Sequence, residues 1–118
     1  MKKIIVSCCV SILFMSCSDV VLVEDISDTY ITVLAPSHGV VLNQTSVSFS
    51  WQSLEDAESY QIQIATPDFM NAVQIVTDST LTGTHFSKEL ELGHYEWRVR
   101  GENSEYHTPY TTQSFSIE

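Results

Sequence analysis

Cysteine is missing from most of this sequence. All three cysteines lie near the amino terminus: Cys8 and Cys9 are inside an apolar run, and Cys17 follows directly after it. Residues 18–118 therefore cannot form a disulfide among themselves. Any domain within them must be stabilised by the packing of its core.

Basic residues are also scarce. Beyond residue 16 the only ones are Lys88, Arg98 and Arg100, against fifteen acidic residues in the whole chain. The formal net charge is −10, and it becomes −12 if residues 1–16, which hold two lysines and no acid, are removed. Because phosphate binding needs clustered lysines and arginines, this charge excludes nucleic acid and disfavours anionic membrane surfaces as partners of the domain. It favours solubility or a cationic partner.

Motifs for metal binding and catalysis are missing as well. The four histidines, His38, His85, His94 and His107, do not have the spacing of a metal site. No Gly-x-Ser-x-Gly motif accompanies the serines, and the acidic residues do not follow the spacing of an EF-hand. We therefore predict that the protein binds no metal ion and no cofactor, and that it is not an enzyme.

The apolar run at the amino terminus is too short to cross a bilayer. It follows Lys2 and Lys3 and spans residues 4–15, which is twelve residues, whereas a transmembrane helix needs about 20. Basic residues followed by an apolar core of about 7–15 residues are typical of a secretory signal peptide. We predict that residues 1–16 are a signal peptide.

The end of this run resembles the lipobox of bacterial lipoproteins. The tetrad Phe14-Met15-Ser16-Cys17 has an apolar residue, a tolerant position, a small residue and then the cysteine. The resemblance implies acylation of Cys17 and cleavage before it, and two or more acyl chains hold a protein stably on a membrane. The alternative is an ordinary secretory signal, which would leave a soluble domain with one thiol.

The residues after the cysteine are acidic, and we predict that 17–29 form a lipidated tether. They resemble the acidic tag that some Gram-negative lineages use to send lipoproteins to the outer face of the outer membrane. They fit a solvated, disordered tether equally well. The apolar stretch 20–23 argues against complete flexibility and is compatible with an added edge strand.

From residue 30 onward, apolar residues alternate with polar ones at a period of two. In one such run, Val47, Phe49 and Trp51 alternate with serines. This pattern is typical of half-buried antiparallel strands, and turn residues separate the runs. For 30–118 we predict an all-β fold, a seven-stranded antiparallel sandwich of two sheets. The expected strands are 30–35, 45–51, 59–66, 72–77, 83–88, 94–100 and 111–117.

Nearly all of 30–118 resembles a fibronectin type III domain. The resemblance is carried by Trp51 at the end of one strand, Tyr60 at the start of the next, and the run from Leu90 to Asn103. It implies that the early tryptophan lies in the core and that Tyr95 is a tyrosine-corner residue, with a buried ring and a hydroxyl bonded to backbone a few residues upstream. Gly101 stands where the family usually has alanine.

Loops offer the candidate binding residues. Both tryptophans occupy inward positions of the alternating pattern and are predicted to lie in the core. Tyr106, His107 and Tyr110 gather in the segment 101–110, and loop tyrosines offer contact area at low entropic cost. We predict these three residues as ligand contacts. The alternative is that Tyr110 begins the last strand and Tyr106 covers the end of the core.

These features together predict a non-enzymatic lipoprotein of the cell envelope, anchored in a membrane, with the outer membrane and the cell surface as the expected location. Its single domain is expected to act as a binding, spacer or assembly module for an envelope protein or a glycan. The second hypothesis is a glycan-binding accessory lipoprotein of an outer-membrane polysaccharide-uptake system. Oligomeric state is left open, since sandwiches of this kind host unrelated roles.

Overall fold

This computed structural model describes residues 22–118 of the chain, which contain eight β-strands. No helix in this part is long and apolar enough to cross a membrane. The strands are β1 (Val33–Ala35), β2 (Val40–Leu42), β3 (Ser46–Trp51), β4 (Ser59–Thr66), β5 (Gln74–Leu81), β6 (His85–Glu89), β7 (Gly93–Glu102) and β8 (Thr111–Ile117).

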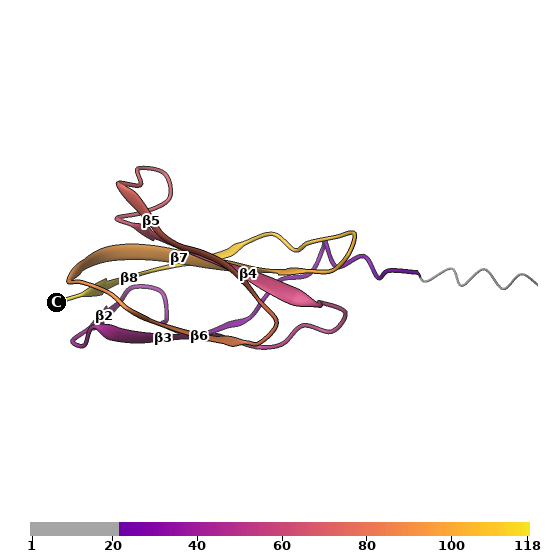
Figure 1. Ribbon diagram of the computed structural model, residues 1–118, viewed down its shortest axis with the longest axis horizontal. Coiled ribbons are helices and arrows are strands. Elements are labelled where there is room, and N and C mark those ends of the chain that lie inside the picture. The colour runs from indigo at the N-terminus through magenta and orange to yellow at the C-terminus, as the bar shows by residue number, and fades with distance from the viewer. Residues whose placement is uncertain (1–21) are drawn as a thin grey trace, which may run out of the picture.

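The strands form two sheets that face each other across the core (Figure 1). One sheet has three strands in the order β1-β3-β6, and the other has five in the order β2-β8-β7-β4-β5. The predicted all-β, two-sheet sandwich is therefore confirmed. The alternation that predicted the strands places one side of each sheet in the core and the other in solvent.

The prediction of seven strands, all antiparallel, is wrong. The additional strand is β2, which pairs in parallel with β8, with Val40 opposite Phe115. The three residues of β2 are all apolar and therefore lack the alternation of apolar and polar residues from which the strands were predicted. After β1 the chain turns at Gly39, which has a φ of 81°, crosses to the other sheet and reaches β8 in the parallel direction.

Two strands are longer than predicted. β5 continues to Leu81 and β7 to Glu102 because both keep pairing with β4, where Gln61 lies opposite Thr80 on one side and Arg100 on the other. The residues involved are polar, so the sequence shows no apolar alternation there. Backbone pairing with a central strand extends them instead.

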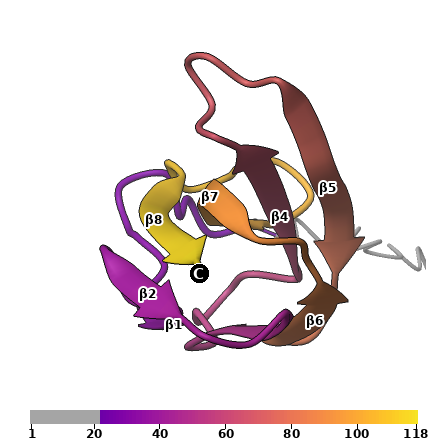
Figure 2. The ribbon, with the colours of Figure 1, turned by 90° about the vertical axis from the view of Figure 1, so that its left-hand side faces the viewer.

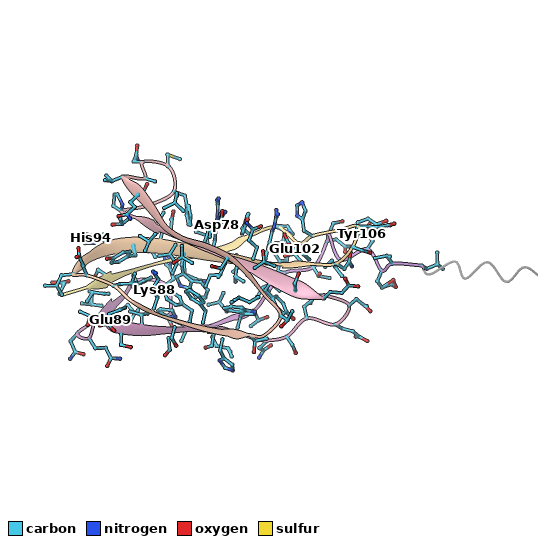
Figure 3. The ribbon with its side chains drawn as sticks, in the orientation of Figure 1. Asp78, Lys88, Glu89, His94, Glu102 and Tyr106 are labelled. Atoms are coloured by element: carbon cyan, nitrogen blue, oxygen red, sulfur yellow. The ribbon has the colours of Figure 1, made fainter. Side chains whose placement is uncertain are left out.

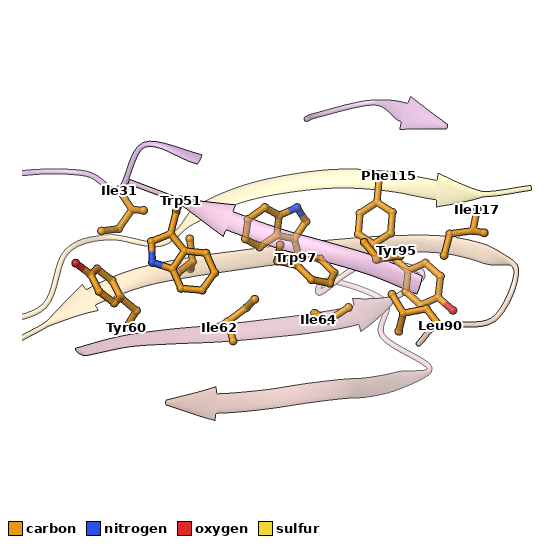
Figure 4. Packing of buried hydrophobic residues seen from close by; sticks show 13 residues of the cluster. Ile31, Trp51, Tyr60, Ile62, Ile64, Leu90, Tyr95, Trp97, Phe115 and Ile117 are labelled. Carbon is orange, nitrogen blue, oxygen red and sulfur yellow. The ribbon is translucent and has the colours of Figure 1, made fainter. Parts of the chain in front are cut away.

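Aromatic side chains from both sheets fill the core (Figure 4). The ring of Phe49 on β3 lies 5.0 Å from that of Trp97 on β7 and 5.8 Å from that of Phe115 on β8, both edge to face. This arrangement is favoured by the charge distribution of aromatic rings. Trp51 and Trp97 are 1% and 0% exposed, which confirms their predicted place in the core.

The tyrosine corner implied by the family resemblance is present. Tyr95 is buried, its ring stacks on Phe115, and its hydroxyl donates a hydrogen bond of 2.8 Å to the carbonyl oxygen of Glu91. Burial, and to a smaller extent the charge of Glu91, raise the pKa of Tyr95. The hydroxyl therefore stays protonated and keeps donating.

Close packing accounts for Gly101, the position where the family usually has alanine. A Cβ atom there would lie 3.2 Å from Cδ1 of Ile31 and 3.3 Å from Cβ of Ala57. Both distances are shorter than ordinary van der Waals contacts. The segment that leads into β1 approaches β7 so closely that only glycine fits without a shift.

Part of the predicted tether packs on the sandwich. Ile26 is 3% exposed, and the chain turns behind it through a hydrogen bond from the Thr29 N–H to the Ile26 carbonyl. Leu22 and Val23 lie in no strand. The other residues of the proposed edge strand, the signal peptide and Cys17 lie outside the described residues.

The sandwich has two distinct ends. We call the end where the described chain begins, at Leu22, the entry end; it also carries the loop between β7 and β8, with Tyr106 (Figure 3). The opposite end, which we call the far end, carries Glu118, His94 at the start of β7, and the loop between β4 and β5.

Candidate functional site

The three predicted contact residues do not form one cluster. Tyr106 and His107 lie in the β7–β8 loop at the entry end, where Tyr106 is half-buried and His107 is exposed. Tyr110 lies beside Arg98 and Arg100, which point outward from β7 on the outer face of the five-stranded sheet. The loop therefore offers two separate surfaces, and ligand contact by these residues stays a prediction.

Asn103 holds the β7–β8 loop in place. Its side-chain oxygen accepts hydrogen bonds from the N–H groups of Glu105, at 3.0 Å, and Tyr106, at 2.8 Å. Its side-chain nitrogen donates to the carbonyl oxygens of Glu24, at 2.9 Å, and Asp56, at 3.3 Å. One amide thus ties this loop to the β3–β4 loop and to the incoming chain.

Thr108 closes the base of the same loop. Its side chain is fully buried, and its hydroxyl accepts a hydrogen bond of 3.0 Å from the Gly101 N–H and donates one of 2.8 Å to the Pro109 carbonyl. The Thr108 N–H donates to the Gly101 carbonyl at 2.9 Å. Because each buried polar group here has a partner, the loop is fixed by internal bonds.

Cations and aromatic rings alternate on the outer face of the five-stranded sheet. The guanidinium carbon of Arg98 lies 4.0 Å from the ring centre of Phe69 and 4.3 Å from that of Tyr110. The guanidinium carbon of Arg100 lies 4.9 Å from the ring centre of Tyr110. We call these four residues the arginine ladder, and each contact is a cation–π interaction.

The two arginines of the ladder differ in their polar partners. Arg100 donates from Nε and forms an ion pair through Nη2 with Glu102, both at 2.9 Å. Among residues 22–118, Arg98 donates from Nε alone, to the side-chain oxygen of Gln63 at 2.7 Å. Within residues 22–118 no carboxylate lies at ion-pair distance from Arg98.

The loop between β4 and β5, residues 67–73, rises away from the three-stranded sheet and carries Phe69 to the ladder (Figure 2). The Phe69 N–H donates to the carboxylate of Glu96 at 2.9 Å, and the Asn71 N–H donates to that of Asp68 at 2.7 Å. Met70 and Val73 remain 90% and 86% exposed. The loop therefore has a fixed base and an uncovered apolar tip.

Tyr110 contributes to the ladder as a neutral ring. Burial, with smaller contributions from the charges of Asp78 and Glu102, raises the pKa of its hydroxyl against the opposing effects of the Arg100 and Arg98 charges. The ring accordingly accepts cation–π contacts without becoming a phenolate.

Among the described residues, no group of three histidine, cysteine, aspartate or glutamate side chains is arranged to hold a metal ion.

The arginine ladder was not predicted from the sequence, although two features of the sequence indicated parts of it. The alternation along β7 places Arg98 and Arg100 on the solvent side of the strand, and Phe69 is an aromatic residue outside the predicted strands. Neither feature says that a loop more than twenty residues earlier folds over the strand. That proximity depends on the pairing of β4 with β7.

Comparison with solved structures identifies the fold as fibronectin type III-like. The chain is similar to the fibronectin(III)-like modules of Clostridium thermocellum CbhA, with a TM-score of 0.55 and 8% identity over 75% of this chain and 95% of that one. It is similar to FN3tt, with a TM-score of 0.54 and 13% identity over 76% and 97% of the two chains. A Fn3-like protein from Clostridium thermocellum matches with a TM-score of 0.50 and 13% identity, over 75% and 88%.

No protein-family model and no curated protein matches the sequence. At these identities the structural matches establish the fold alone.

Proposed function

We propose that the protein is a lipoprotein of the cell envelope, anchored through Cys17, whose fibronectin type III-like domain acts as a non-enzymatic binding, spacer or assembly module. The observation that carries this proposal is the difference between the two ends of the domain. The chain enters at one end, while the outer sheet face and the far end, with Met70 and Val73, remain exposed. A domain anchored in this way presents those surfaces to the space above the membrane.

The short connection to the anchor supports a role close to the membrane. Glu24 accepts a hydrogen bond from Asn103, and Ile26 is buried against the sandwich, so neither belongs to a free linker. Residues 18–23 span at most about 20 Å at roughly 3.3 Å per residue. Partners of the domain are therefore limited to molecules at the membrane surface.

Mass spectrometry of the amino terminus tests the anchoring. We expect an acylated Cys17 as the first residue, and recovery of the protein in the detergent phase after phase partitioning. The matched variant Cys17→Ser removes the acceptor thiol and should move the protein to the aqueous phase. An unmodified amino terminus in the native protein, with partitioning unaffected by Cys17→Ser, would contradict the proposal.

Affinity capture of the intact protein from its native envelope tests the role as a binding module. Tyr106→Ala and Tyr110→Ala separate the two surfaces that the predicted contact residues form, because Tyr106 lies at the entry end and Tyr110 in the arginine ladder. If one variant no longer captures a partner, the substituted tyrosine identifies the surface that binds this partner. If both variants retain every partner while the domain stays folded, the predicted contacts are wrong.

The glycan-binding alternative has less support from the described residues. Sugar rings stack on uncovered aromatic faces, but the rings of Phe69 and Tyr110 contact guanidinium groups, and both tryptophans are buried. Among the described residues, Tyr30, which is 65% exposed, is the aromatic side chain that remains most uncovered. Binding to a glycan array, abolished by Tyr106→Ala, would favour this alternative over a protein partner.

A further inference from the structure

We infer that Arg98 and the hollow beside it form a binding site for a peptide that ends in a free carboxylate and carries a cationic side chain. This inference deepens the proposed function by naming the chemistry of the partner. It rests on the domain acting as a binding module, although its test does not depend on the lipid anchor.

The first argument is the preorganisation of Arg98. Its guanidinium carbon lies 4.0 and 4.3 Å from the ring centres of Phe69 and Tyr110, and its Nε donates to Gln63. These contacts fix the orientation of the guanidinium group before any ligand arrives. A fixed planar fork loses less conformational entropy on binding than a free side chain does.

The second argument is the unused hydrogen-bonding capacity of this group. Arginine has five N–H donors, and Nε uses one. The two Nη atoms of Arg98 have no hydrogen-bond or ion-pair partner among residues 22–118, whereas Arg100 is paired with Glu102. Glu96, on the same face of β7, accepts from the Phe69 N–H. A carboxylate fits the remaining fork through two parallel hydrogen bonds.

The third argument is the composition of the hollow. Arg98 lines a surface depression of about 580 Å³ together with five other residues, Asp68, Phe69, Met70, Asn71 and Glu96. Two of them, Asp68 and Glu96, supply carboxylates that attract a cation. The exposed thioether chain of Met70 offers apolar contact to a methylene stem. The lining thus combines one cationic fork with an acidic and apolar rim.

The charge of the chain decides between an amphoteric peptide and an acidic polymer. Residues beyond 16 carry three basic side chains against fifteen acidic ones, so a polyanion such as an acidic polysaccharide is repelled. A peptide end with one carboxylate and one ammonium group avoids that repulsion. It satisfies Arg98 and the acidic rim at the same time.

Titration of the full chain in detergent micelles, followed by amide and Arg Nε NMR signals, tests the site. The probe is Nα-acetyl-lysine, which has a free carboxylate and an ammonium group. We expect shifts at Phe69, Glu96 and Arg98 with a millimolar dissociation constant. Nα-acetyl-lysine amide, which lacks the carboxylate, should bind at least about tenfold more weakly, since it loses the paired bonds to the fork.

Two variants on the same strand provide the matched control. Arg98→Lys should weaken binding at least about tenfold, because an ammonium group cannot make two parallel bonds, whereas Arg100→Lys should change it less than about twofold. Asp68→Asn, which keeps an acceptor for the Asn71 N–H, should weaken binding of Nα-acetyl-lysine but not that of Nα-acetylglycine, which has no cation for Asp68 to attract. This third variant tests the site even if Arg98→Lys disturbs the loop.

Several results would overturn the inference. They are equal binding of the amide and the free acid, equal losses in Arg98→Lys and Arg100→Lys, and tighter binding of glucuronate than of Nα-acetyl-lysine, which would indicate an acidic sugar. Lack of acylation at Cys17 with intact peptide binding would contradict the anchoring alone. An acylated protein that binds no probe would contradict this site alone.

Discussion

The two ends of this sandwich use polar side chains in different ways. At the entry end, the side chains of Asn103 and Thr108 form hydrogen bonds with backbone groups of their own loop and of the incoming chain. At the far end, the N–H groups of Phe69, Asn71 and Val73 are hydrogen-bonded, but the side chains of Met70 and Val73 remain uncovered. Side-chain hydrogen bonds therefore hold the β7–β8 loop to its surroundings, whereas the loop 67–73 exposes apolar side chains.

The largest effect is expected from Thr108→Val at the entry end. Valine keeps the shape of the side chain but leaves the Gly101 N–H without its side-chain acceptor in a fully buried position. We expect the free energy of unfolding to fall by about 2 kcal/mol, the usual cost of an unpaired buried donor. Urea denaturation measures it, with Thr108→Ser, which keeps the hydroxyl, as the control expected to lose less.

Asn103→Ala and Asn71→Ala compare the two ends directly. Asn103 makes four side-chain hydrogen bonds, and its removal should cost about 1 to 2 kcal/mol of unfolding free energy. The side chain of Asn71 makes no hydrogen bond within the described residues, so its removal should cost less than about 0.5 kcal/mol. Equal losses in thermal or urea unfolding would remove the distinction between the ends.

Tyr95→Phe tests the hydrogen bond of the tyrosine corner, which lies near the far end. The substitution removes the hydroxyl that donates to the Glu91 carbonyl and keeps the ring on Phe115. A loss of about 1 kcal/mol in urea unfolding is expected. A loss comparable to that of Thr108→Val would mean that the far end is held as firmly as the entry end.

The smallest effect is expected from Met70→Ser. The side chain is 90% exposed, so its replacement should change the free energy of unfolding by less than about 0.5 kcal/mol. The same variant should reduce capture of a partner from the envelope if the far end is the contact surface. Destabilisation by more than 1 kcal/mol would show that the loop tip is packed rather than free.

Much of the fold was predictable because half-buried strands carry their own signal. The alternation around Phe49, Trp51 and Trp97 predicted the strands and the core, and the resemblance to fibronectin type III domains implied the corner at Tyr95. β2 was not predicted because its three residues are all apolar and show no alternation, and its parallel pairing depends on the position of the distant strand β8.

The candidate site was less predictable because it depends on contacts between distant segments. Tyr106, His107 and Tyr110 are neighbours in the sequence, but Tyr110 is the last residue of the loop, directly before β8, and lies against Arg98 of β7. Phe69 joins the same ladder from another loop. Composition identified these aromatic residues, and only the register between β4, β7 and β8 shows which of them meet.

Amide hydrogen exchange of the two loops tests most directly the claim that one end of the sandwich is closed and the other open. The Thr108 amide, bonded to the Gly101 carbonyl, and the Tyr106 amide, bonded to Asn103, should exchange at least about 100-fold more slowly than the Met70 amide at the tip of the far-end loop. Equal exchange rates in the two loops, or slower exchange at Met70, would contradict the account.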